Sequence, residues 1–158
     1  MLRWASPLPW ALALLAVGAL VSTCAERPDS GETGPQVAYG TQETAELLPG
    51  TWLREYREEG VQVRRLLVLE AKGGFREVSR IVGTDGQVQE FVNEGTWLYD
   101  GTNLKRRYTS LNGKPPSRLN VPFVTFEVRF DSRNDFVGVD HIHDRTIRYE
   151  RVPSETEL

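Results

Sequence analysis

The sequence predicts an all-β domain: a small antiparallel up-and-down barrel of about eight strands, after a signal helix and a disordered linker. Turn signals rich in Gly, Asn and Asp recur every 8 to 14 residues or so from residue 59 onward. Between them, short runs of Val, Ile, Thr and aromatic residues alternate with polar ones at a period of two. No window shows a convincing amphipathic helix.

The first 24 residues are predicted to be a signal peptide. Arg3 is the only charge before Glu26, and Leu8 to Val21 is apolar apart from Pro9 and Gly18. As a helix, about 14 residues span roughly 21 Å, which is short of a bilayer core of about 30 Å. A short apolar run behind a positive start is typical of an exported chain.

Cys24 ends this segment, and Leu20 to Cys24 resembles a bacterial lipobox, whose cysteine receives a lipid. Thr23 departs from the usual Gly or Ala, so ordinary signal cleavage after Ala25 is the alternative. Because Ala25 is not acidic, the resemblance implies an outer-membrane lipoprotein that faces the periplasm. We expect the membrane to be a partner through a lipid anchor on Cys24.

The rest of the chain divides into three parts. Residues 25–46 are rich in Gly, Pro, Thr and acids and are predicted to be a disordered linker. Residues 47–152 form the predicted β domain, and residues 153–158 a flexible tail. The strands expected with defined limits are Thr51–Arg57, Val61–Leu69, Phe75–Val82, Val121–Phe130, Phe136–Ile142 and Thr146–Val152. Closure of the barrel would pair the first strand with the last and remove both free edges.

Several short motifs follow one another in this domain. They are Leu48-Pro49-Gly50-Thr51-Trp52, Gly73-Gly74-Phe75, Gly95-Thr96-Trp97 leading into Tyr99-Asp100-Gly101, Phe136-Val137-Gly138-Val139 and Tyr149-Glu150-Arg151-Val152. Their order resembles the small bacterial lipocalin-like domains, in which Gly-x-Trp opens the first strand. The repeated Gly-Thr-Trp-Leu, about 45 residues apart, indicates either an old duplication or two glycines that each let a tryptophan strand start at a crowded floor.

The resemblance implies structural roles for four residues. An arginine near the last lipocalin strand stacks on the Gly-x-Trp tryptophan, so Arg151 is expected over Trp52 as a cation–π contact. Gly50 and Trp97 belong to the same predicted closure of the barrel. The strands are short for a lipocalin, so a shallow barrel filled partly by side chains is expected.

Composition and motifs argue against several functions. The formal net charge is −3, which does not favour nucleic-acid binding. His141 and His143 stand two apart and could face one metal with Asp140 or Asp144, but nothing completes the ligand set. We therefore expect a surface pair, no metal and no cofactor.

No phosphate loop or Gly-x-Ser-x-Gly motif is present, so the sequence predicts a protein that is not an enzyme. Its many carboxylates are expected on the solvated strand faces. These are Glu55, Glu70, Glu77, Glu90 and Glu127.

Two sets of residues point to a polar cavity. Arg54 and Tyr56 share a strand face with Trp52, and Arg106 and Tyr108 likewise share a face. An inward arginine requires an anion or a carboxylate partner. A small anionic or amphipathic ligand is one interpretation, and an internal salt bridge, for example to Glu90, is the other.

Two functions follow. The first is a lipocalin-like envelope protein that holds a small amphipathic or anionic ligand. The second is a non-enzymatic envelope lipoprotein whose packed barrel docks a protein partner. A large internal cavity favours the first, whereas a filled interior with an exposed apolar patch favours the second.

Overall fold

The protein folds into eight strands and one short helix within the part of the chain that its computed structural model describes, residues 38–117 and 122–158. The elements are α1 (Thr41–Leu47), β1 (Gly50–Glu58), β2 (Val61–Leu69), β3 (Gly74–Val82), β4 (Val88–Tyr99), β5 (Asn103–Leu111), β6 (Phe123–Ser132), β7 (Asp135–Asp140) and β8 (Arg145–Val152). The predicted signal peptide, Cys24 and most of the predicted linker lie outside the described residues. Within them, no helix has the length and apolar composition needed to cross a membrane.

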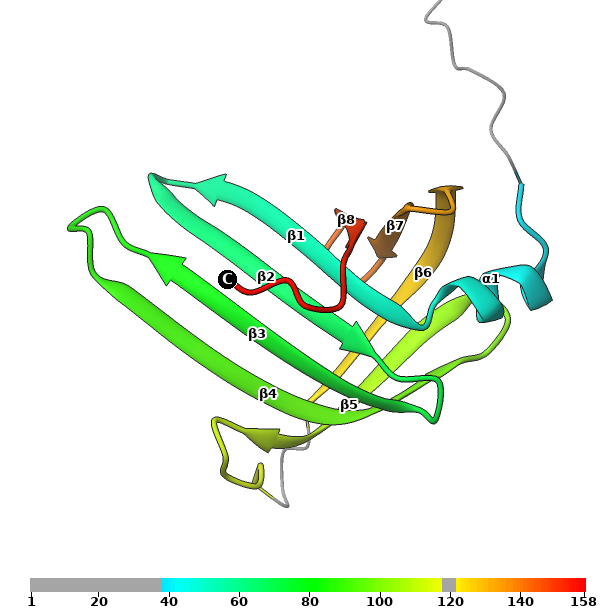
Figure 1. Cartoon of the computed structure of the whole chain (residues 1–158), viewed down its shortest axis with the longest axis horizontal. Coiled ribbons are helices and arrows are strands. Elements are labelled where there is room, and N and C mark those ends of the chain that lie inside the picture. Colours follow the sequence, from blue (N-terminus) through cyan, green and yellow to red (C-terminus); the bar gives the residue numbers. More distant parts are fainter. Residues whose placement is uncertain (1–37, 118–121) are drawn as a thin grey trace, which may run out of the picture. The chain divides into compact units, whose positions relative to one another are not determined.

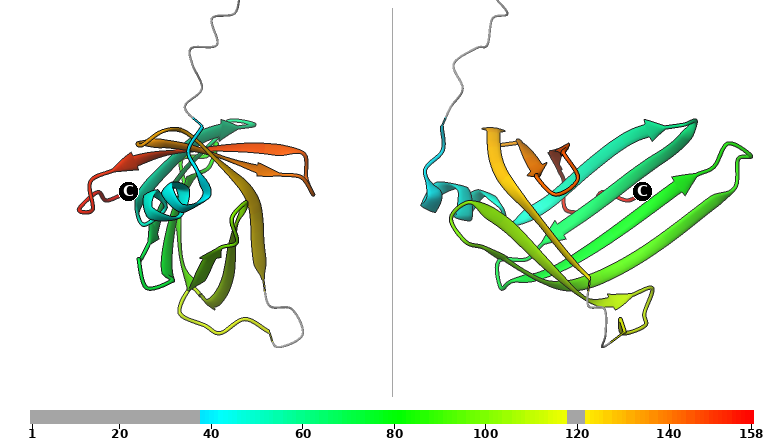
Figure 2. Two further views of the ribbon diagram at one scale, coloured as in Figure 1. Left: turned by 90° about the vertical axis from the view of Figure 1, so that its right-hand side faces the viewer. Right: turned by 180° about the vertical axis from the view of Figure 1, so that it is seen from behind.

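The strands form a closed antiparallel barrel in sequence order, which confirms the predicted fold class (Figure 1). Each strand pairs with the next one along the chain, and β1 pairs with β8 at Thr51–Leu53 against Glu150–Val152. The seam between the first and last strands is short. The rest of β1, which runs on to Glu58, does not pair with the rest of β8, which begins at Arg145. Figure 2 shows these strands from the side and from behind.

The expected strand limits agree closely with the structure. Val61–Leu69 is β2 to the residue, and the other expected strands differ by a few residues at their ends. The expectation that Gly95 starts a strand is wrong, because Gly95 lies inside β4 at a register shift between Glu94 and Gly95. A Cβ on Gly95 would lie 2.0 Å from the carbonyl oxygen of Arg107, so close approach of β5 requires glycine.

The end of the predicted linker is not disordered. Residues 41–47 form helix α1, whose Thr44 is buried, and Leu48 immediately after it is fully buried. The polar composition hid this helix, because it is too short to carry an amphipathic pattern and is stabilised by its contacts with the barrel. Figure 1 shows α1 at one end of the barrel, which we call the floor.

The core lies at the floor and is dominated by aromatic side chains. Trp52 meets Phe136 edge to face, with ring centroids 4.7 Å apart. Phe136 in turn stacks on Tyr149 at 4.9 Å. Each such pair adds about 0.5–1.5 kcal/mol beyond its apolar burial. The floor half of the barrel is therefore filled by side chains.

The C-terminal tail contains a turn. The backbone N–H of Thr156 donates to the carbonyl of Pro153 at 3.1 Å. Leu158 then lies beside Leu66 and Val78 on the outer face of β2 and β3, where Figure 1 places the C-terminus. Leu66, although it faces outward, is only 7% exposed.

Candidate functional site

The end of the barrel opposite the floor contains a cavity of about 300 Å³, which we call the mouth. It is lined by Arg54, Tyr56, Glu58, Arg65, Arg106, Phe123, Val124, Thr125, Asp140, Ile142, His143, Arg145, Ile147 and Tyr149. These side chains come from six of the eight strands and the β7–β8 turn. The volume is at the lower end of the range for small-molecule sites.

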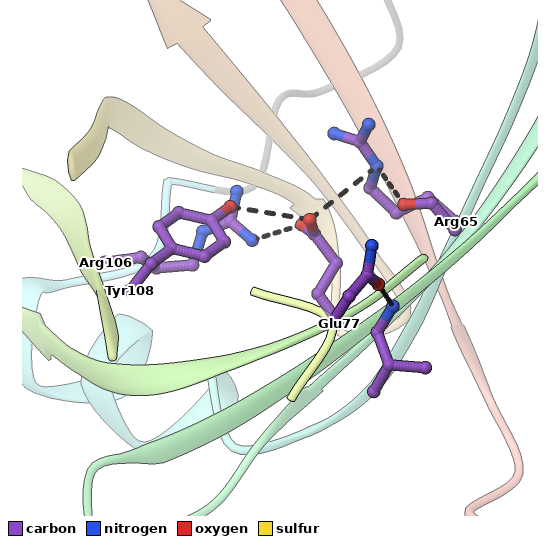
Figure 3. A network of polar contacts seen from close by, with 7 residues as sticks. Arg65, Glu77, Arg106 and Tyr108 are labelled. Carbon is purple, nitrogen blue, oxygen red and sulfur yellow. Dashed lines mark hydrogen bonds and ion pairs between the residues drawn. The ribbon is translucent and has the colours of Figure 1, made fainter. Parts of the chain in front are cut away.

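A buried ion pair forms the base of the mouth (Figure 3). Arg106 Nη1 donates to Glu77 Oε2 at 2.6 Å, and the two side chains are only 2% and 4% exposed. The hydroxyl of Tyr108 lies 3.4 Å from the other Glu77 oxygen. Such a pair is held by mutual compensation, because either charge alone would be strongly disfavoured by burial.

Arg65 is the second arginine near Glu77. Its Nε donates to Ser79 Oγ at 3.0 Å and lies 4.0 Å from Glu77 Oε1. Burial acts to raise the pKa of Glu77, but the charges of Arg106 and Arg65 outweigh it and leave that pKa below its usual value. Glu77 is therefore a carboxylate shared unequally by two guanidinium groups.

Arg54 is the third arginine of the mouth. Its guanidinium lies over the Tyr56 ring, 4.2 Å from the centroid, as a cation–π contact. No carboxylate of the described residues forms an ion pair with it. The predicted set is thus brought together: Arg54, Tyr56 and Arg106 line the mouth, and Tyr108 contacts the carboxylate at its base.

Two predictions about carboxylates are wrong: that Glu90 is the partner of an inward arginine, and that Glu77 lies on a solvated face. Arg106 pairs with Glu77, not with Glu90, which lies beside Arg76 and Val78 on the outer face. Glu77 was expected on a solvated face and is 3% exposed. The sequence could not identify it, because Phe75, Glu77 and Ser79 form a face no more apolar than the opposite face of β3.

The floor contains the contact that the resemblance implied. Arg151 Cζ lies 4.1 Å from the centre of the Trp52 ring. Its guanidinium donates to three backbone carbonyls, those of Leu47, Pro49 and Arg133. Gly50 leaves the space this requires, since a Cβ there would lie 2.2 Å from Arg151 Nη1. Trp97 packs at the edge of the core and donates its Nε1–H to the carbonyl of Glu70.

The two histidines do not converge. His141 Nε2 lies 2.9 Å from Glu127, whereas His143 Nδ1 lies 2.8 Å from Asp140. Both belong to the β7–β8 turn rather than to a strand, so the two-residue spacing does not place them on one face. Within the described residues, no three His, Cys, Asp or Glu side chains gather as metal ligands.

A second cavity of about 300 Å³ lies at the floor, between α1, the β4–β5 turn and β6. Its lining includes Tyr39, Thr44, Tyr99 and Phe130. The Tyr99 hydroxyl already donates to the carbonyl of Gly101. None of its lining residues is a buried charge, so the mouth is the stronger candidate for a ligand site.

Comparisons with known proteins found no match: no protein-family model matches the chain, and neither does any curated protein.

Proposed function

We propose that this chain is an exported lipocalin-like protein of the bacterial envelope, anchored by a lipid on Cys24, that binds a small amphipathic anion in its barrel mouth. One observation carries the binding proposal: the cavity is lined by four arginines and by apolar side chains that include the exposed Phe123 and Ile142. Convergent charged groups in a concave site above a packed core are typical of a small-ligand pocket. The signal peptide and lipobox motifs support export and anchoring.

The proposed role is binding rather than catalysis. The titratable groups at the base of the mouth, Glu77 and Arg106, are locked in an ion pair. General acid–base catalysis at neutral pH requires a group that can exchange a proton, and Arg106 cannot.

The alternative is an envelope lipoprotein that docks a protein partner. One observation favours it: the floor half of the barrel is filled by aromatic side chains, which leaves no deep calyx. The exposed apolar side chains are Val88, Leu98, Phe123 and Ile142. Two of these, Phe123 and Ile142, line the mouth itself, which favours ligand binding over docking.

Native mass spectrometry tests the proposal. The full mature chain, purified in mild detergent from the envelope of its own host, is expected to carry a small adduct that is lost on denaturation. The adduct's mass would then identify the ligand. A clean apo mass in several preparations would contradict ligand binding and favour the docking lipoprotein.

The same spectra test anchoring. Acyl chains on Cys24 would add their mass after release of the signal peptide, and this mass would persist on denaturation. Substitution Cys24→Ser should abolish it. An unmodified chain beginning at residue 26 would instead show ordinary cleavage after Ala25.

A further inference from the structure

Two arginines of the mouth lack a close carboxylate partner. Arg54, Arg65, Arg106 and Arg145 line the cavity, and Arg145 is paired with Asp140. Glu77 is the only buried carboxylate of the described residues. Its closest contact is with Arg106 at 2.6 Å, and Arg65 approaches it only to 4.0 Å. Arg54 and Arg65 are half-buried, and two guanidinium groups without a close carboxylate favour an additional negative charge in the cavity.

Arg54 and Arg65 stand directly opposite each other in the register of β1 and β2. Both point into the barrel, where side chains of opposed residues lie about 5 Å apart at Cβ. Like charges in this position destabilise a sheet, and neither arginine has a carboxylate within normal hydrogen-bond distance among the described residues. Two guanidinium groups side by side are suited to bind one planar or tetrahedral oxyanion.

The other charged groups of the mouth do not fill this role. Asp140, at the end of β7, is engaged by His143 and by Arg145, at 2.8 and 3.3 Å. Glu58 lies at the exposed end of β1. It forms no ion pair with another described residue.

One atom adds an independent sign of an incomplete site. Arg106 Nε is buried and has no hydrogen-bond partner among the described residues. Buried guanidinium nitrogens are normally paired, and exceptions in a native fold tend to mark functional sites. Arg106 lines the same cavity as Arg54 and Arg65.

We propose that Arg54 and Arg65 bind the oxyanion group of the ligand, a carboxylate or a phosphate, and that the ligand enters head first. This inference rests on the proposed function and specifies its ligand. The apolar part then extends outward along Ile147 and Val124 to Phe123 and Ile142. Phe123 and Ile142 are 64% and 82% exposed and would gain most from being covered.

The orientation follows from the packing. The aromatic cluster around Trp52 and Phe136 fills the floor, so no apolar chain can pass below the Arg106–Glu77 pair. A deep hydrophobic calyx would receive the apolar part first. Here the buried Arg106–Glu77 pair lies at the base of the cavity, and the exposed Phe123 and Ile142 lie at its rim beside Arg145 and His143.

The test is calorimetric titration of the full mature chain with octanoate, octyl phosphate and uncharged octanol. We expect both anions to bind and octanol to bind at least about tenfold more weakly, because it cannot form charge-assisted hydrogen bonds. Titrations with inorganic phosphate and acetate show whether the site prefers a free anion or the headgroup of a longer ligand. We expect phosphate to bind more weakly than octyl phosphate, and acetate more weakly than octanoate.

Arg54→Gln and Arg65→Gln should each weaken octanoate at least about tenfold. Arg57→Gln is the matched control, because Arg57 lies on the same strand and faces outward, and it should bind as the parent does. Urea unfolding of each variant shows whether the fold is intact.

The outcomes separate the two levels of the proposal. Equal binding of octanol and octanoate, or octanoate binding unchanged in both arginine variants, would overturn the anion site while leaving a ligand cavity. If Arg54→Gln and Arg65→Gln both retain the native adduct, the anion site is likewise overturned. If no probe binds and no native adduct exists, the proposed function itself fails.

Discussion

The floor and the mouth of the barrel each hold an inward arginine among aromatic side chains, but they satisfy it differently. At the floor, the Arg151 guanidinium is met by three backbone carbonyls and the Trp52 ring. At the mouth, Arg106 is met by one carboxylate and keeps a buried Nε without a partner among the described residues. The guanidinium group at the floor completes the packing, whereas Arg54 and Arg65 at the mouth have no carboxylate in close contact.

This difference indicates where function resides. A barrel end that serves only structure matches each polar group with a partner, as the floor does. Departures from such matching concentrate at functional sites, where a ligand supplies the missing interaction. The following predictions test the comparison.

The largest effect is expected at the base of the mouth. Glu77→Ala leaves Arg106 buried without its carboxylate, which should lower the free energy of unfolding by about 3–5 kcal/mol in urea denaturation. Glu90→Ala, on the outer face of the neighbouring strand, should change it by no more than about 0.5 kcal/mol. Similar values for the two variants would contradict the buried ion pair.

Arg151→Ala should follow at the floor. It removes the cation–π contact and the donors to the carbonyls of Leu47 and Pro49, so a loss of about 1–3 kcal/mol is expected. Arg148→Ala is the control, because Arg148 lies on the outer face of the same strand in an exposed pair with Asp131 and should cost less than about 1 kcal/mol. Unchanged thermal stability of the Arg151 variant would show that the floor closes without it.

Acid should weaken the ion pair at the base of the mouth. The pKa of Glu77 lies below its ordinary value of 4.5, chiefly through Arg106 and against burial, so the stabilisation is complete above pH 4.5 and is lost as pH falls through the folded-state pKa. The loss should be smaller than in Glu77→Ala, because the protonated carboxyl stays in place. Urea unfolding between pH 3 and 7 should show a steeper acid decline for the parent than for Glu77→Gln.

The smallest effect is expected for Arg54→Gln in the absence of ligand. Because Arg54 opposes Arg65, its removal should leave the free energy of unfolding unchanged or raise it by a few tenths of a kcal/mol. Urea denaturation at low salt gives the best contrast, since salt screens such repulsion. A clear loss of stability would mean that Arg54 has a structural role like that of Arg151.

The strand plan could be predicted from the sequence. Turn residues and a period of two are local properties, so they predict the limits of β2 to the residue and a meander whose closure the structure confirms. The contact between Trp52 and Arg151 was also accessible, because a recognised motif marks each end of the domain. The set of Arg54, Tyr56, Arg106 and Tyr108 followed from alternation alone.

Tertiary structure alone decided the rest. The two faces of β3 are similarly apolar, so only barrel closure turned Glu77 inward and made it the partner of Arg106. Helix α1 is too short to be stable by itself and forms because the floor of the barrel receives it. Alternation determines which side chains share a face of one strand, but which face becomes the interior, and what meets there from distant strands, depends on long-range packing.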